Sequence, residues 1–345
     1  MNYTHLLEKK EIRASVPCRV DLGGTLDIST FYLPLAHLKP ASFNIALDMR
    51  THVTLSTWTK GRIRISSKGF ASAEFDRDTV RFDHPMGLMF AVARYFDADG
   101  IHIQINSTSP PKSALGGSSA AAVAIIAAFY AVLGEPINPK KIVWLAHYIE
   151  SSVAGVPCGV QDHAAAAFGG VNLWEWQMGE TGPEFERIPV FENTQDLVDF
   201  NDQILVAYCG IPHVSKDINK QWVDAFIRGE TTAIFEKIVE ITKEFYRAVK
   251  TKNFSLAGEL MAQETRLRLE MTPEVLDNTG KKLFERAVAL NCGARFTGAG
   301  GGGCLWAIGE RDKILDLALA WKKLLEPVPD AKLLDTGIDT NGILI

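Results

Sequence analysis

The chain has 345 residues, of which 47% are hydrophobic and 22% charged, a balance typical of a globular enzyme with more than one domain. Its formal net charge of -5 and the lack of any long Lys/Arg block argue against a nucleic-acid or membrane partner, because both reward clustered positive charge. The five cysteines form no C-x-x-C pair, and the opening residues MNYTHLLEKKEIR lack the apolar core of a signal peptide. We therefore expect a cytoplasmic protein without a disulfide framework or a zinc site.

The first half of the chain alternates predicted strands with predicted helices. The predicted strands cover residues 51–57, 62–66 and 101–105. A short amphipathic helix is predicted at 85–96. Two longer helices follow, one from near Ser118 to Leu133 and one from Pro139, after the N-cap Asn138, to Gly155.

Helical periodicity disappears between Glu175 and Asp202, where acidic residues, Gly and Pro dominate. We place the domain boundary there, which predicts an N-terminal domain of residues 1–180 and a C-terminal domain of residues 200–345. In the second domain one helix is predicted from the N-cap Thr272 to near Gly293. The predicted strands of this domain cover residues 204–208, 294–296, 304–308 and 333–338.

The most informative segment is Pro110–Ser119 (PPKSALGGSS), which directly precedes the Ala-rich helix. Glycines permit a tight turn that brings several N–H groups to an anion, and a helix start adds unpaired N–H groups and partial positive charge. The serines can cap the helix or offer a hydroxyl to a phosphate or a magnesium ion. On these residues alone, a phosphate site and a plain capped helix are equally supported.

A second glycine loop, Thr297–Gly303 (TGAGGGG), lies between two predicted strands. Such a run is costly in chain entropy, so a bare connection rarely has this composition. The loop therefore indicates close approach of the backbone to a ligand or to another loop, without specifying which ligand.

Two acidic residues stand out by their surroundings. Glu150 lies on the helix that begins at Pro139, beside small and apolar residues, and is either a surface residue or an inward metal ligand. Taken alone, the surface interpretation is favoured.

Asp162 is the one acid between Glu150 and Glu175, in an apolar and Gly-rich stretch, and a buried carboxylate is costly unless it is paired or functional. It either has a functional role, which we favour, or caps a short helix at 164–167, and the adjacent His163 is interpreted as structural.

Near the N-terminus, Val16–Asp27 (VPCRVDLGGTLD) leaves a short strand through a Gly-Gly turn. Arg19 could neutralise a phosphate or orient a carboxylate, and Asp27 could accept hydrogen bonds from substrate hydroxyls. An ordinary turn that ends in an aspartate is the alternative.

Taken together, these segments resemble the three ordered motifs of the GHMP kinases, a superfamily that includes galactokinase, homoserine kinase, mevalonate kinase and phosphomevalonate kinase. Val16–Asp27 is similar to the first motif, Pro110–Ala121 to the second and Gly293–Cys304 to the third. Within the superfamily the resemblance is nearest to the D-glycero-D-manno-heptose 7-phosphate kinase and fucokinase branch of sugar kinases. The segments that carry it include Gly159–Asp162, Phe168–Gly170 and Gly210–Ser215.

The resemblance implies an α+β GHMP kinase fold, with a ribosomal protein S5 domain 2-like N-terminal domain that binds ATP and a ferredoxin-like C-terminal domain. It implies a sugar kinase that uses ATP and Mg²⁺ to phosphorylate the anomeric hydroxyl of a hexose or of a heptose (7-phosphate). The expected partner is a small-molecule sugar or sugar phosphate, and the expected state is a monomer or homodimer. Three alternatives stay open: a non-catalytic sugar and ATP sensor, an ATP-dependent decarboxylase of the same fold, and a kinase of a non-sugar alcohol.

Carried over by position, the resemblance assigns Asp162 to accept or orient the acceptor's hydroxyl proton, with Arg19 as the basic residue beside it. It assigns Glu150 and Ser118 to magnesium, with Ser119 as the second choice for the hydroxyl. The residues expected to bind the nucleotide are Pro111, Leu115, Gly116, Gly117, Ser118, Ser119, Gly298, Gly300 and Gly301. The residues expected to bind the acceptor are Asp27, Gly159, Asp162 and Gly302.

Several positions depart from the motifs. Cys18 stands where glycine is commoner, Gly117 replaces a frequent serine, and Lys112 and Ala114 replace glycines. A phosphorylated sugar would require further basic residues in the pocket. The candidates are Lys39, Arg50, Lys216 and Lys220.

Overall fold

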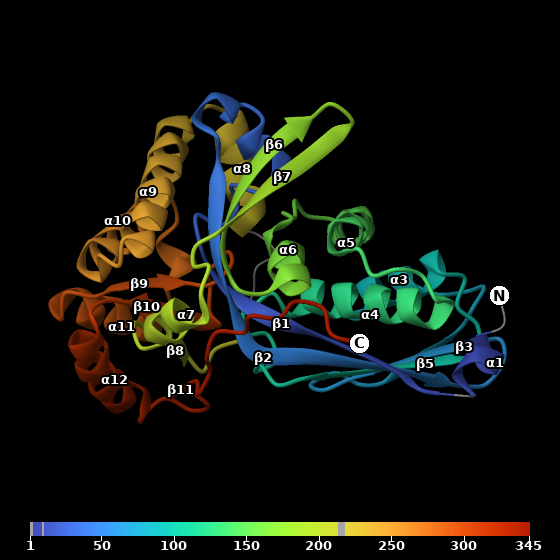
Figure 1. Cartoon of the computed structure of the whole chain (residues 1–345). Helices are drawn as coiled ribbons and strands as arrows, with labels where there is room; N and C mark the ends of the chain where they lie inside the picture. The colour runs from blue at the N-terminus through green and yellow to red at the C-terminus, as the bar shows by residue number, and fades with distance from the viewer. Residues whose placement is uncertain (1–2, 9, 213–217) are drawn as a thin grey trace.

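One long strand, β2 (Ala41–Thr57), is central to the larger of two sheets and bends between the part beside β6 and the part beside β5 (Figure 1). It pairs with β1 (Ile12–Leu22) along one side. On the other side its first residues pair with β6 (Val171–Gly179) and its last with β5 (Ile101–Ser107). The order of the seven-stranded sheet is β4-β3-β5-β2-β6-β7, with β1 added on β2; the remaining strands are β3 (Arg62–Ser67), β4 (Ala73–Asp76) and β7 (Gly182–Pro189).

The computed structural model describes residues 3–8, 10–212 and 218–345. Helices cover one face of the larger sheet, as Figure 1 shows in green and cyan. In chain order, the helices that precede β8 are α1 (Tyr3–Leu7), α2 (Ser29–Tyr32), η1 (Ala36–Leu38), α3 (Gly87–Tyr95), α4 (Gly117–Leu133), α5 (Pro139–Val153), α6 (Gln161–Phe168) and α7 (Thr194–Asn201). Helix α4 is buried along most of its length, because its Ala-rich sequence lets α5, α6 and the sheet approach closely.

The smaller sheet has four antiparallel strands in the order β11-β8-β10-β9. Its strands are β8 (Ile204–Tyr208), β9 (Gly293–Phe296), β10 (Cys304–Ile308) and β11 (Lys332–Leu333). Its helices are α8 (Ile218–Ile227), α9 (Thr232–Lys250), α10 (Phe254–Met271), η2 (Pro273–Val275), α11 (Asn278–Ala289) and α12 (Arg311–Leu325). Two sheets with helices packed on them confirm the predicted α+β class.

Strand β10 shows how the two sheets are joined. Because side chains alternate along a strand, Leu305 and Ala307 enter the core beneath α11 and α12. Trp306 and its same-face neighbours enter a second cluster, which contains Val20 of β1 and Phe43 of β2. The larger and smaller sheets are therefore held together by a continuous hydrophobic cluster.

The C-terminal segment crosses from the smaller sheet back to the larger one, shown as the red trace that ends beside β1 in Figure 1. Leu344 forms an isolated β-bridge with Ser15 of β1. Arg50 fixes the segment: its Nη2 donates to the carbonyls of Ser15 and Gly342, at 2.7 and 2.6 Å, and its Nη1 pairs with Asp339. This segment ties the end of the chain to the sheet that carries the first motif.

Three predictions of local structure need correction. The stretch 175–202, where no helical periodicity is predicted, contains helix α7, N-capped by Asn193, and before it the hairpin of β6 and β7 in the larger sheet. The single helix predicted from Thr272 to Gly293 is interrupted after η2, and α11 begins at its own cap, Asp277, whose side chain accepts from Gly280 N–H at 2.6 Å. The strand predicted at 333–338 is confined to β11 and one bridge between Ile338 and Leu47, because the chain turns toward the larger sheet there.

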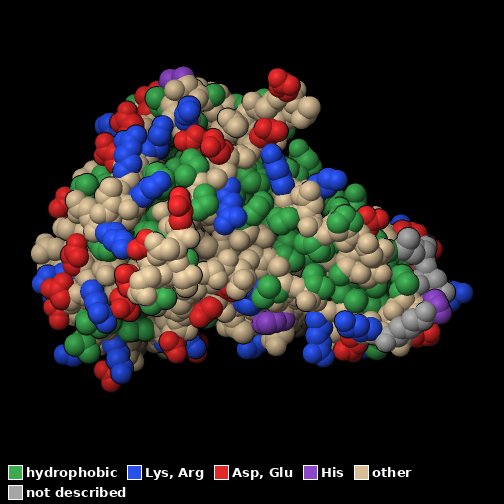
Figure 2. Space-filling view, in the orientation of Figure 1, with side chains coloured by type: hydrophobic (Ala, Val, Ile, Leu, Met, Phe, Trp, Pro, Cys, Tyr) green, Lys and Arg blue, Asp and Glu red, His purple; other side chains and the backbone are tan. Residues whose placement is uncertain are grey.

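Positive and negative side chains are interspersed over the face seen in Figure 2, and neither sign gathers into a stripe. Among the described residues, no helix is both long and apolar enough to span a bilayer. The longest apolar helix, α4, is a core helix.

Arg50→Met tests the attachment of the C-terminal segment. The substitution leaves the buried Asp339 without its cation and removes a donor from three backbone carbonyls, so the free energy of unfolding should fall by about 3–5 kcal/mol in urea denaturation. The matched control is Arg62→Met on β3, whose partner Glu74 is partly exposed, and the expected loss there is below about 1 kcal/mol. Equal losses in the two variants would contradict the anchoring role.

Candidate active site

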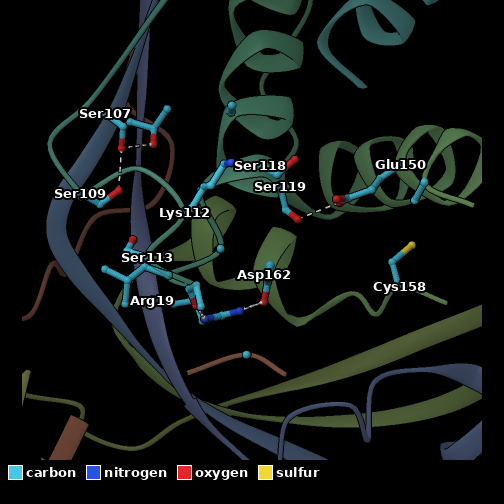
Figure 3. A pocket seen from close by; sticks show the side chains of 18 of the residues that line it. Arg19, Ser107, Ser109, Lys112, Ser113, Ser118, Ser119, Glu150, Cys158 and Asp162 are labelled. Carbon is cyan, nitrogen blue, oxygen red and sulfur yellow. Dashed lines mark hydrogen bonds and ion pairs between the residues drawn. The ribbon is translucent and has the colours of Figure 1, made fainter. Parts of the chain in front are cut away.

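A cavity of about 400 Å³ lies where β1, the Pro110–Ser119 loop and α6 meet, and Figure 3 shows its polar side chains. Most of the predicted site residues line it. These are Arg19, Asp27, Pro111, Leu115, Gly116, Gly117, Ser118, Ser119, Glu150, Gly159, Asp162 and Gly298. Three predicted residues, Gly300, Gly301 and Gly302, do not line it. Residues from all three motifs therefore meet at one cavity, although they are far apart in the sequence.

Arg19 and Asp162 form an ion pair in this cavity (Figure 3). Nε and Nη2 of Arg19 both lie 2.7 Å from Oδ1 of Asp162, and Nη1 donates to the carbonyl of Ala114 at 2.8 Å. Burial alone would lower the pKa of Arg19, but the carboxylates of Asp162 and Asp21 outweigh it and raise the pKa. Asp162 does not cap α6, whose N-cap is Val160, and its side chain stays 24% exposed. A fixed cation thus holds one carboxylate oxygen of Asp162, and the carboxylate remains accessible from the cavity.

The N-terminus of α4 opens into the cavity. Gly116 is its N-cap with a φ of +75°, and Gly117 and Ser118 are exposed there. The turn is fixed from behind, because Arg19 N–H donates to the Leu115 carbonyl at 3.1 Å. The first N–H groups of a helix have no partner within the helix, so this end can bind an anion.

Glu150 points inward, so the surface interpretation of this residue is wrong. Its Oε2 accepts a hydrogen bond from Ser119 Oγ at 2.8 Å and lies 2.7 Å from Nε2 of the buried His163. Burial alone would raise the pKa of Glu150, but His163 and Ser119 outweigh it and lower the pKa. The carboxylate is therefore kept charged beside the start of α4, and the residue that contacts it is Ser119, the second choice of the sequence analysis.

Asp27 is the most deeply buried of the acids that line the cavity, with 3% exposure. Burial raises its pKa to about 6, while a hydrogen bond from the backbone N–H of Gln161 at 2.9 Å lowers it and Asp162 raises it further. A Cβ at Gly159 would lie 1.7 Å from Asp27 Oδ2, so only glycine fits against this carboxylate. The three acids of the site therefore have different electrostatic environments.

The second glycine loop supports the first one. Gly303 N–H donates to the Ile211 carbonyl at 2.8 Å, and a Cβ at this residue would lie 2.7 Å from the Ser113 carbonyl. Gly301 N–H donates to the Val275 carbonyl at 3.0 Å. The loop therefore permits close backbone packing under the Pro110–Ser119 segment, and Gly298 is its glycine at the cavity wall.

Both halves of the chain match one superfamily. Residues 84–170 match the family "GHMP kinases N terminal domain", and residues 245–326 match "GHMP kinases C terminal". The chain belongs to the GHMP kinase superfamily. The predicted fold is confirmed, and so is the enzyme class, a kinase that phosphorylates a hydroxyl group.

Relatives of this GHMP kinase fall in more than one branch. The mevalonate kinase of Thermococcus onnurineus is 28% identical over 326 residues, which cover 86% of this chain and 89% of the relative. The D-glycero-alpha-D-manno-heptose 7-phosphate kinase of Campylobacter jejuni, from the branch predicted by the motifs, is 23% identical over 95% of this chain and 98% of the relative. The crystal structure of Lactococcus lactis galactokinase complexed with galactose aligns with a TM-score of 0.73 over 99% of this chain and 97% of that chain, at 18% identity.

Sequence reasoning missed several polar groups of this GHMP kinase. Lys68 and Lys112 line the cavity, and a chain of hydroxyls runs from Thr51 through Ser107 to Ser109, with oxygen separations of 3.2 and 2.8 Å (Figure 3). Lys112 could have been found from its place inside the second motif. The hydroxyl chain depends on the pairing of β2 with β5, which no local pattern gives.

Asp27→Asn tests the burial of the deepest carboxylate in this GHMP kinase. Because the folded-state pKa is raised from 3.8 to about 6, the folded protein binds more protons than the unfolded one between those values, and wild-type stability falls as the pH rises through them. The neutral variant lacks this loss, so at pH 8 it should be more stable by about 2–3 kcal/mol, and the difference should shrink toward zero near pH 4. Urea denaturation at both pH values measures this difference, with the exposed Asp83→Asn as the control. A variant less stable than wild type at pH 8 would contradict the assignment.

Proposed function

We propose that this GHMP kinase transfers the γ-phosphoryl group of ATP to a hydroxyl of a sugar, with the anomeric hydroxyl of a hexose or heptose as the acceptor. The observation that carries the proposal is the Arg19–Asp162 ion pair beside the N-terminus of α4. Phosphoryl transfer requires positioning, charge stabilisation and one group that orients the attacking hydroxyl. The cavity offers all three.

The phosphate-binding end of the site is formed by the backbone. Exposed Gly117 and Ser118, with the positive end of α4 behind them, suit the β- and γ-phosphates of a nucleotide. Lys112 and Arg19, which also line the cavity, add positive charge. Their placement leaves the apolar part of the cavity, with Phe70 and Met89, for the base of ATP.

The proposed reaction uses Asp162 as the acceptor of one proton. The acceptor's hydroxyl oxygen forms a bond to the γ-phosphorus while the bond from that phosphorus to the β–γ bridging oxygen breaks, and ADP leaves. The hydroxyl proton passes to the carboxylate of Asp162, which releases it to solvent. Arg19 keeps that carboxylate in place and stabilises negative charge on the transferring group.

The donor set of the site fits Mg²⁺, which prefers oxygen ligands and takes one or two from the protein while phosphates and water supply the rest. We propose Glu150 as the carboxylate ligand, because its pKa is lowered and its charge is kept beside α4. Ser118 is the proposed hydroxyl ligand, and Ser119 orients Glu150 through its 2.8 Å hydrogen bond. When bound, the ion supplies neutralisation of phosphate charge.

The acceptor end favours an uncharged polyol. Asp27 lies there with Thr25, Gln161 and Asn219, whose side chains are suited to hydroxyl groups. A carboxylate on the acceptor would be repelled by Asp27. Arg50 is committed to the C-terminal segment, and neither Lys39 nor Lys220 lines the cavity, while Lys216 and the last residues of the Gly210–Ser215 segment lie outside the described residues. Lys68 and Lys112 do line the cavity, with Lys112 proposed above for the nucleotide, so our preference for an unphosphorylated sugar over a heptose 7-phosphate rests on the repulsion of anions by Asp27.

A second candidate is a mevalonate-type alcohol, because the archaeal mevalonate kinases share 27–28% identity with this chain. The same phosphate-binding end would serve that reaction. The candidates differ at Asp27, which would have to lie beside the carboxylate of such an acceptor.

A panel of acceptors tests the proposal. ADP release with Mg-ATP is measured against free hexoses, 6-deoxyhexoses, heptoses, heptose 7-phosphates and mevalonate. Turnover on a sugar should fall by about 10²–10⁴-fold in Asp162→Asn, because the variant lacks the proton acceptor. The control is Asp199→Asn, an exposed carboxylate of α7, which should keep wild-type turnover.

Mevalonate turnover that exceeds every sugar would favour the second candidate. Full sugar turnover in a folded Asp162→Asn variant would remove Asp162 from the mechanism. Nucleotide binding without turnover on any acceptor would favour a sensor of the same fold.

A further inference from the structure

Asp21 follows Arg19 by two residues on β1. It has no exposure to solvent and does not line the cavity. Its Oδ1 accepts from Gly298 N–H at 2.8 Å and lies 3.4 Å from Nη1 of Arg19. Its Oδ2 accepts from Nη1 of Arg295 at 2.9 Å. One carboxylate therefore contacts Arg19 of the first motif and two residues of the third motif, Gly298 and the buried Arg295.

The arginine belongs to a larger buried network. Glu264 on α10 holds Arg295 through Oε2 and Arg268 through Oε1, each at 2.9 Å, and none of the three side chains is exposed. Burial alone would raise the pKa of Glu264, but the two arginines outweigh it and lower the pKa. With Asp162, Arg19 and Asp21, the network forms a chain of six groups of alternating sign with no net charge.

Arg268, the last of these six charged groups, contacts the first motif. Arg268 Nη2 donates to the Gly24 carbonyl at 2.7 Å, and its Nη1 donates to Thr25 Oγ1 at 3.1 Å. Thr25 has a φ of +75°, which is a strained conformation for a β-branched residue. Arg295 of the smaller sheet and Arg268 of α10 therefore hold the two ends of the turn that leads from Arg19 to Asp27.

We propose that Asp21 is a positioning residue for phosphoryl transfer, which fixes Arg19 and the Gly298 loop relative to each other through the buried network of Arg295, Glu264 and Arg268. The proposal rests on the proposed function, since Arg19 matters only if it holds the catalytic carboxylate.

The physical reason is that Arg19 is 3% exposed and cannot be satisfied by water. Asp162 neutralises it from the cavity side, and Asp21 from the core side. Without Asp21, the position of Arg19 would depend on Asp162 and one carbonyl alone, so the carboxylate would lose its fixed geometry. A displacement of about 1 Å is enough to lower a rate by about 10²-fold.

Asp21→Asn is the first test, measured by kcat, by the acceptor KM, by the Kd of the non-hydrolysable analogue AMPPNP, and by Tm. We expect kcat per folded enzyme to fall by about 10–100-fold and the Kd of AMPPNP to change by a smaller factor, because the start of α4, proposed to bind the phosphates, does not contact Asp21. The control is Asp339→Asn, which breaks the buried Arg50–Asp339 pair, neither of whose residues lines the cavity, and should lower Tm without changing kcat. Equal kcat in Asp21→Asn and wild type would overturn the proposal.

Asp21→Asn leaves a buried arginine without its anion and could fail to fold. The double variant Asp21→Asn with Arg295→Met removes both charges, so its Tm should recover while kcat stays low. Recovery of kcat together with Tm would overturn the proposal, because it would show that Asp21 only balances charge.

The separation of Arg19 Nε and Asp162 Oδ1 in crystals of the double variant provides a measurement that does not depend on any acceptor. We expect it to lengthen from 2.7 Å to beyond hydrogen-bond range. An unchanged pair, with Gly298 also in place, would overturn the positioning role even if no acceptor had been found. A changed pair with no turnover on any acceptor would contradict the proposed function alone.

Discussion

The structure of the site depends on the burial of one cation. Arg19 is enclosed by β1, the Ala114 carbonyl and α6, so each of its donors must be satisfied by the protein. That requirement brings Asp162, which is 143 positions away in the sequence, to a fixed place beside the start of α4. It also explains why the three glycine-containing segments converge, since each supplies a carbonyl, an N–H or a carboxylate to the groups around Arg19.

The three acids of the cavity are suited to different tasks because their surroundings differ. Glu150 is kept charged by Ser119 and His163 and is suited to bind a cation. Asp27 is buried with a raised pKa and is suited to contact hydroxyl groups rather than anions. Asp162 is the one paired with a permanent cation yet accessible from the cavity, which suits a group that receives a proton and releases it. This division of roles is the physical basis for placing a neutral acceptor at Asp27.

The sequence predicted those parts of the fold and site that depend on local pattern. Strand alternation, the Asn138–Pro139 helix start and the glycine turn before α4 all have short-range causes, and the structure contains them. The hairpin of β6 and β7 was missed, because its strands are recognised only by their pairing with each other and with β2. The network around Asp21 was missed for the same reason, although the Glu264–Arg268 spacing of four residues on a helix was a visible signal. Glu150 was misread in isolation, because its burial depends on His163 of the next helix.

A crystal structure with Mg²⁺ and a non-hydrolysable ATP analogue tests the central claim most directly. The account predicts the γ-phosphate at the exposed Gly117–Ser118 end of α4, the metal ion bound to Glu150, and Asp162 facing the γ-phosphorus across the space left for the acceptor. A nucleotide bound with its phosphates away from α4, or a metal ion bound without Glu150, would contradict the account.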